Sequence, residues 1–275
     1  MRLLVHLLLS LVAAWPAYFQ TRPVRLMPWN EYNRQSNRFK WPYIIKVQRL
    51  QGRLFYYGGM HSYNPTEPQA SDIEAHWAEF RPEIAFNEGG DPPIEKSRDE
   101  AVKKSGEAGL VRFLAARDKV PVMSLDPSYA EQFACLSRKF APEQIKLFFV
   151  LRAVAQHVRN RGAETLDNEL NTNLFPFFAG TPGLNGSPNS VAELETSYVK
   201  YLPNQAGYRQ TPMSWFDPTQ SENFLNEISR RLSDYRDEYM IDLLTRHIRE
   251  GQRVFAVVGG SHVVRQASAI RRAVR

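Results

Sequence analysis

The sequence contains the same short pattern twice, an apolar run that ends in Gly-Gly-x-His. The first copy, YYGGMH, ends at His61, and the second, VVGGSH, ends at His262. A short apolar run bounded by glycines is typical of a buried strand, and the glycine pair lets the backbone turn tightly where the strand ends. The chain is therefore predicted to contain two buried strands that each lead into a histidine.

Helical and strand patterns alternate along the chain, which indicates an α/β fold with a mixed or parallel central sheet flanked by helices. Gln51 and Gly52 separate the first two strand-like runs, YIIKVQRL and RLFYYGGM, as in a hairpin. The other predicted strands are PEIAFNEGG, VPVMSLDP and RVFAVVGG. The predicted helices are Ser71 to Phe80 with a capping box at Ser71 and Glu74, Gly106 to Arg117, Glu143 to Arg161, Glu222 to Glu250, and a last helix from Val264.

We predict one α/β domain over residues 41–275, with two related halves that each contain a strand ending in G-x-x-H. Within it, residues 140–220 form a predicted helical and loop-rich cap, because Pro, Gly and aromatic residues alternate there. Trp215 and other aromatic residues of this section are candidates to line a pocket, or alternatively to anchor the loops.

The N-terminal stretch is typical of an exported protein. Arg2, a short apolar run and small residues after it match a signal peptide over residues 1–17, with a retained N-terminal anchor as the alternative. Residues 18–40 lack periodicity and are predicted to form an extended linker. We therefore expect a periplasmic or secreted protein, in which the single Cys135 cannot form an internal disulfide.

The composition and charge of the chain indicate which kinds of partner to expect. Apolar residues make up 43% and charged residues 23% of the chain, as in soluble globular proteins. The formal charge of +6 is spread among acidic residues without a dense basic block, so we expect no nucleic-acid partner and no membrane contact beyond an N-terminal anchor. A small-molecule or peptide substrate is expected instead. The sequence contains no G-x-S-x-G, H-E-x-x-H, Walker A or G-x-G-x-x-G pattern.

The two histidines are candidate site residues because ligands of open α/β sheets bind at the carboxyl ends of the strands. Glu88 follows a third predicted strand, so His61, Glu88 and His262 are predicted to share one site. The glycines of the two motifs would let a substrate approach the backbone closely. These candidate substrate-binding glycines are Gly58, Gly59, Gly259 and Gly260.

Four motifs, in order, resemble the TraB/PrgY/GumN and Tiki family, which is related to erythromycin esterases and ChaN-like proteins. They are YYGGMH, FNEGG, RDEYM around Arg236, and VFAVVGGSH. The resemblance spans the chain from about Tyr43 onward and implies an α/β fold with two related halves. It also implies a metal-dependent peptidase activity, in which His61, Glu88 and His262 hold a divalent ion of the Mn, Co or Zn type and Arg236 stabilises developing negative charge.

Two other functions, and a structural role for Arg236, are also compatible with the sequence. The erythromycin-esterase-like relatives imply hydrolysis of an amide or ester without metal, with His61 as general base, Glu88 orienting or sharing a proton, and His262 or Arg236 binding the oxyanion. The ChaN-like relatives imply haem binding without catalysis. Arg236 has a structural alternative, an ion pair with Glu88 or with Asp237.

Overall fold

The computed structural model describes residues 24–275. The predicted signal peptide or anchor, residues 1–17, and the first part of the predicted linker lie outside the described residues. No helix among residues 24–275 is long and apolar enough to cross a membrane.

A five-stranded mixed sheet forms the centre of one half of the molecule, with the strand order β1-β2-β5-β3-β4. β1 is antiparallel to β2, and the other neighbouring pairs are parallel. The strands are β1 (Tyr43–Arg49), β2 (Gly52–Gly59), β3 (Ile84–Asn87), β4 (Val122–Ser124) and β5 (Arg253–Gly259). The expected α/β class is confirmed, whereas the relation between two halves of the sequence stays a prediction.

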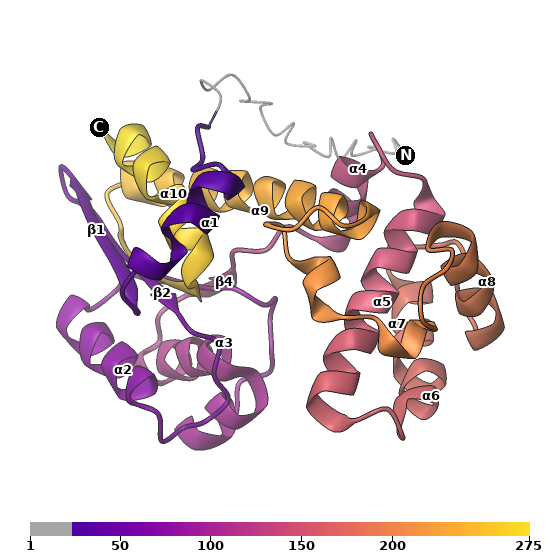
Figure 1. Ribbon diagram of the computed structural model, residues 1–275. Helices are drawn as coiled ribbons and strands as arrows, with labels where there is room; N and C mark the ends of the chain where they lie inside the picture. The colour runs from indigo at the N-terminus through magenta and orange to yellow at the C-terminus, as the bar shows by residue number, and fades with distance from the viewer. Residues whose placement is uncertain (1–23) are drawn as a thin grey trace, which may run out of the picture.

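Helices cover both faces of this sheet (Figure 1). α2 (Pro68–Phe80) and α3 (Arg98–Asp118) pack on one face, and α9 (Phe224–Arg249) and α10 (Gly260–Val274) pack on the other. Because successive strand residues point to opposite faces, Tyr56 belongs to the core beneath α9 and α10 and Tyr57 to the core beneath α2 and α3. The continuous apolar runs of β2 and β5 follow from this double coverage.

A helical subdomain with its own apolar core forms the other half and contains the stretch in which a cap was predicted (Figure 1). The first part of the long helix α9 packs in the core of this subdomain, and its last part packs on one face of the sheet. The elements between β4 and α9 are α4 (Tyr129–Leu136), α5 (Pro142–Arg161), α6 (Leu166–Glu169), η2 (Leu170–Leu174), α7 (Phe175–Gly180), α8 (Val191–Tyr201), η3 (Tyr208–Gln210) and η4 (Met213–Phe216).

Two local predictions were wrong. α2 begins at Pro68, so Ser71 lies inside the helix and does not cap it, because proline itself suits the first helical turn. Residues 29–38, part of the predicted extended linker, form helix α1 (Trp29–Gln35) and the turn η1 (Ser36–Arg38). A tertiary contact fixes α1: the guanidinium carbon of Arg265 lies 3.7 Å from the ring centre of Trp29, whose Nε1 donates to Asp234.

Candidate functional site

The sheet register brings the predicted site residues to one edge. Gly59 of β2 and Gly259 of β5 are paired neighbours in parallel strands, and Asn87 of β3 pairs with Val257 on the other side of β5. The residues that follow these three parallel strands therefore leave the sheet at the same carboxyl edge. His61, Glu88 and His262 meet there, although His262 lies in the first turn of α10 and not at a strand end.

Glu88 contacts Arg236, the backbone of Gly259 and His262. Its Oε1 accepts a hydrogen bond of 2.7 Å from Nη2 of Arg236, and its Oε2 accepts one of 2.7 Å from the backbone N–H of Gly259. Nε2 of His262 lies 3.4 Å from the same Oε1. Burial raises the pKa of Glu88, but His262 and Arg236 outweigh this effect and hold the pKa well below its ordinary value. Glu88 is thus an anion at neutral pH and a weak proton acceptor.

His262 is held from its other ring nitrogen by a buried carboxylate. Its Nδ1 lies 2.6 Å from Oδ1 of Asp237, which also accepts a hydrogen bond of 2.7 Å from Gln266. Arg265 forms an ion pair with the second oxygen of Asp237. Burial lowers the pKa of His262, but Glu88 and Asp237 outweigh it and raise the pKa to about 9. The imidazole is therefore cationic near neutral pH.

Arg236 bridges two carboxylates, Glu88 after β3 and Asp126 after β4. Besides Glu88, its Nε donates to Oδ1 of Asp126 at 2.8 Å, and Oδ2 of Asp126 accepts from the backbone N–H of Gly89 at 2.7 Å. Burial lowers the pKa of Arg236, but Glu88 and Asp126 outweigh this effect, so the pKa lies above its ordinary value. Of the two alternative ion pairs, the one with Glu88 is present. Asp237 instead contacts His262, because adjacent helical residues point about 100° apart.

His61 lies at the solvent-facing side of the site. Its side chain is 64% exposed, and its Nδ1 lies 3.6 Å from Oε2 of Glu107. Its Nε2 lies 2.8 Å from the position that a Cβ atom on Gly259 would occupy, and Oε2 of Glu88 lies 3.3 Å from the same point. The Glu107 carboxylate raises the pKa of His61, partial burial opposes this, and Glu88 raises it further. One imidazole nitrogen thus faces a carboxylate and the other faces the site.

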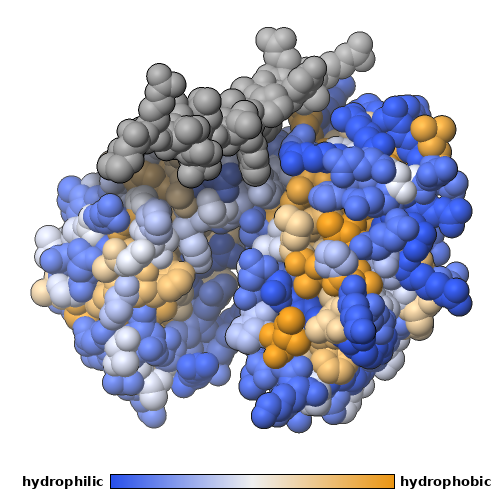
Figure 2. Space-filling model, turned by 180° about the vertical axis from the view of Figure 1, so that it is seen from behind, coloured by the Kyte–Doolittle hydropathy of each residue, from blue (hydrophilic) through white to orange (hydrophobic). Residues whose placement is uncertain are grey.

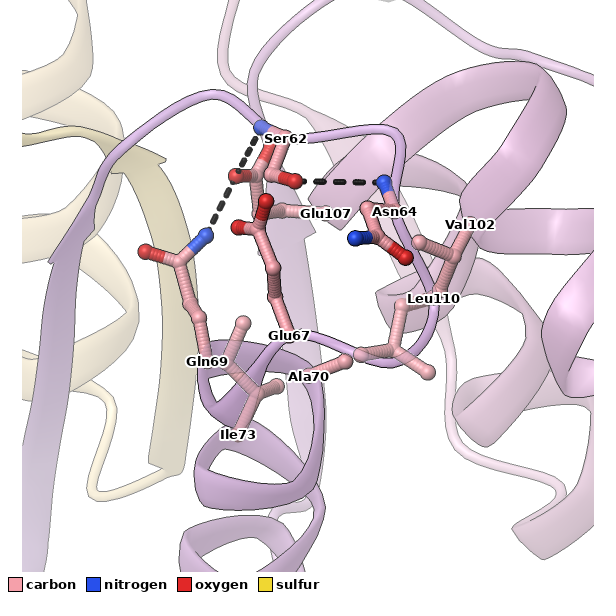
Figure 3. A pocket seen from close by; sticks show the side chains of 9 residues that line it. All are labelled: Ser62, Asn64, Glu67, Gln69, Ala70, Ile73, Val102, Glu107 and Leu110. Carbon is pink, nitrogen blue, oxygen red and sulfur yellow. Dashed lines mark hydrogen bonds between the residues drawn. The ribbon is translucent and has the colours of Figure 1, made fainter.

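Glu107 is placed by a break in helix α3. Ser105 and Gly106 leave the helical conformation, and Gly106 adopts φ +56°, which glycine tolerates without strain. Oε1 of Glu107 then accepts hydrogen bonds from the backbone N–H of Ser62 at 2.9 Å and from Nε2 of Gln69 at 2.6 Å. Figure 3 shows these groups meeting beside a small pocket between α2, α3 and the segment that follows β2. The segment that carries His61 is thereby tied to two helices.

Among the four candidate glycines and Trp215, one glycine lies beside the side chains of the site. Only Gly259 faces His61 and Glu88, whereas a Cβ on Gly58 would meet the backbone of Tyr43 and Gly260. The other two glycines make room for side chains of the protein itself: Gln69 lies against Gly59, and the ring of Trp41 lies against Gly260. Trp215 is buried in the apolar core of the helical subdomain. Packing, rather than substrate approach, therefore accounts for Gly58, Gly59, Gly260 and Trp215.

Two imidazoles and a carboxylate are suitable ligands for a divalent ion, but here both ring nitrogens of His262 face carboxylates, those of Asp237 and Glu88. Both oxygens of Glu88 already accept hydrogen bonds, and one of the donors is the guanidinium of Arg236. Within residues 24–275, no group of three or more His, Cys, Asp and Glu side chains is arranged to hold a metal ion. The metal site at His61, Glu88 and His262 stays a prediction, as does haem binding.

Sequence reasoning missed three acidic residues of the site, Glu107, Asp126 and Asp237. Asp126 follows a predicted strand, as Glu88 does, so the same strand-end signal applied to it. Asp237 was considered only as a partner of Arg236. Glu107 follows a glycine within a helical pattern, which is a weak signal of a helix break.

The chain was compared with family models, curated proteins and solved structures. No family model, no curated protein and no solved structure matches the chain.

Proposed function

We propose that this protein hydrolyses an amide or ester bond, with His61 as the general base that activates water. The observation that carries the proposal is the placement of His61, which presents Nε2 to the site beside Gly259 and Glu88 while Nδ1 faces Glu107. A carboxylate on one ring nitrogen favours the tautomer that leaves the other nitrogen free to accept a proton. The exposed side chain is also accessible to a substrate and to water.

The other charged groups suit different roles in the same reaction. Glu88 is a poor base, because His262 and Arg236 keep its pKa low, but its negative charge stabilises an imidazolium at His61. The cationic His262 lies next to Glu88 and stabilises negative charge that develops on the substrate. Arg236 binds Glu88 and Asp126 and fixes their positions. The resemblance to erythromycin esterases supports this metal-independent scheme, and the occupied oxygens of Glu88 favour it over the metal-dependent one.

The experiment compares hydrolysis of 4-nitrophenyl esters and aminoacyl 4-nitroanilides by the purified protein and by His61→Gln. Loss of a general base lowers kcat by about 100-fold or more, so the variant is expected to lose most of its activity. His76→Gln is the matched control, because His76 lies on α2 and pairs with Asp72 and Glu79 instead. Equal rates in the wild type and His61→Gln, at unchanged melting temperature, would reject His61 as the base.

A further inference from the structure

One arginine interrupts an apolar stretch of helix α5. Arg152 stands in the run LFFVLRAVA, in which the residues on either side are apolar and mostly buried, and its own side chain is partly buried. A charge among apolar residues of a helix is costly unless a partner compensates for it. The cost of placing the Arg152 charge in this helix therefore has to be offset by a partner.

An aromatic contact shows which way the face of α5 with Arg152 is turned. Phe149 lies one helical turn before Arg152 and packs edge-on against Tyr129, with ring centres 5.6 Å apart. Tyr129 begins α4, three residues after Asp126, which binds Arg236. The face of α5 that carries Arg152 is thus turned toward the candidate site, and the charges of Arg236, Glu88 and Asp126 all act on its guanidinium.

Arg152 has no partner of its own in the part of the chain that the structure describes. It forms no hydrogen bond or ion pair with residues 24–275, because the nearby Glu88 and Asp126 are already bound by Arg236. Burial lowers the pKa of Arg152, and Arg236 lowers it further, yet an arginine stays protonated in proteins. A partly desolvated guanidinium without a carboxylate is a suitable partner for an anionic group of a ligand.

Aromatic side chains near Arg152 suit a ligand that has an apolar part next to its anionic group. The rings of Tyr129 and Phe177 pack against each other with centres 5.7 Å apart, and the two residues remain 38% and 50% exposed. Figure 2 shows a cleft between the two halves of the molecule, and α5 belongs to the helical half (Figure 1). Small-molecule sites are lined mainly by apolar and aromatic side chains, with a few polar or charged groups that fix the orientation of the ligand.

We propose that Arg152 binds a carboxylate of the substrate, so that the preferred substrates are esters or amides of compounds with a free carboxylate near the bond that is cleaved. An apolar part of the substrate would lie against Tyr129 and Phe177. The inference rests on the proposed hydrolase function for its kinetic test, but binding of a carboxylate can be measured without turnover.

The kinetic test uses two esters of similar size, 4-nitrophenyl hemisuccinate and 4-nitrophenyl butyrate, of which only the first carries a carboxylate. A charge-assisted hydrogen bond contributes enough to change binding by about 10- to 100-fold. Arg152→Gln is expected to raise the KM for hemisuccinate by that factor and to leave butyrate hydrolysis unchanged, with partial recovery in Arg152→Lys. Arg159→Gln is the control, because Arg159 is an exposed arginine of the same helix. Equal loss on both esters would overturn the proposal.

Calorimetric titration with succinate separates this inference from the hydrolase proposal. We expect His61→Gln to bind succinate as the wild type does, and Arg152→Gln to lose binding at an unchanged melting temperature. If neither ester is hydrolysed but succinate binding depends on Arg152, the hydrolase proposal fails and the carboxylate site stands. If Arg152→Gln binds succinate as tightly as the wild type, or the wild type binds none, Arg152 is not a carboxylate site.

Discussion

His262 and Asp237 are joined by a hydrogen bond of 2.6 Å between Nδ1 and Oδ1, and the carboxylate of Asp237 is fully buried. Asp237 lies on α9 and His262 on α10, so this contact connects the two helices that cover one face of the sheet. It also sets the charge and orientation of the imidazole that faces Glu88. Stability and the candidate site therefore depend on the same buried pair.

This pair predicts a pH dependence of stability. The pKa of His262 is raised from 6.5 to about 9, so its contribution to stability is complete below pH 6.5 and is lost as the pH rises through 9. A shift of this size corresponds to on the order of 3 kcal/mol, because one pKa unit is about 1.4 kcal/mol. Urea unfolding between pH 6.5 and 9.5 is expected to show this loss in the wild type and a flatter profile in His262→Asn. Parallel profiles for the two proteins would contradict it, and His76→Asn serves as the control.

Glu107 is predicted to set the protonation of His61. In Glu107→Gln the negative charge is removed, so the pKa of His61 falls toward 6.5, and the rise of kcat/KM with pH moves to lower pH. We expect kcat itself to fall by about 10-fold, because the imidazole loses its orienting carboxylate. NMR titration of the His61 ring measures the pKa directly. Glu100→Gln, at an exposed position in the same helix, is the control, and an unshifted His61 pKa in Glu107→Gln would refute this role.

Gly259→Ala is predicted to separate activity from stability. The new methyl group would lie 2.8 Å from Nε2 of His61 and 3.3 Å from Oε2 of Glu88. The exposed imidazole can move away, so we expect the free energy of unfolding to change by less than about 1 kcal/mol while kcat falls by about 100-fold. Gly180→Ala, where no atom lies within 4 Å of the new methyl group, is expected to change neither. Full activity in Gly259→Ala would show that His61 is not required in its observed position.

Chelation is predicted to leave hydrolysis unchanged. In the scheme with His61 as base, no step uses a metal ion, and Glu88 is bound by the guanidinium of Arg236 and the backbone N–H of Gly259. Activity is measured before and after treatment with EDTA, together with metal analysis of the purified protein. Loss of activity after chelation, with recovery on adding Mn²⁺, Co²⁺ or Zn²⁺, would instead support the metal-dependent scheme implied by the Tiki resemblance.

The periodicity of the sequence was sufficient to predict most of the sheet and its helices. The hairpin of β1 and β2, strand β5 and helix α5 were each indicated by apolar spacing or by glycine position, since these patterns reflect local geometry. Helix α1 was missed because its stability comes from Trp29 packing on Arg265, a contact between residues far apart in the chain. Local patterns contain no information about such a contact.

For the site, the amino-acid sequence by itself determined which chemical groups are present and that His61, Glu88 and His262 follow predicted buried strands. Only the tertiary structure decided their partners. The strand order places β5 between β2 and β3. The break at Gly106 turns Glu107 toward His61. Arg236 forms an ion pair with Asp126 and not with Asp237. Strand order, helix rotation and burial are set by packing of the whole chain, and these long-range contacts fix the distances and pKa shifts on which the chemistry depends.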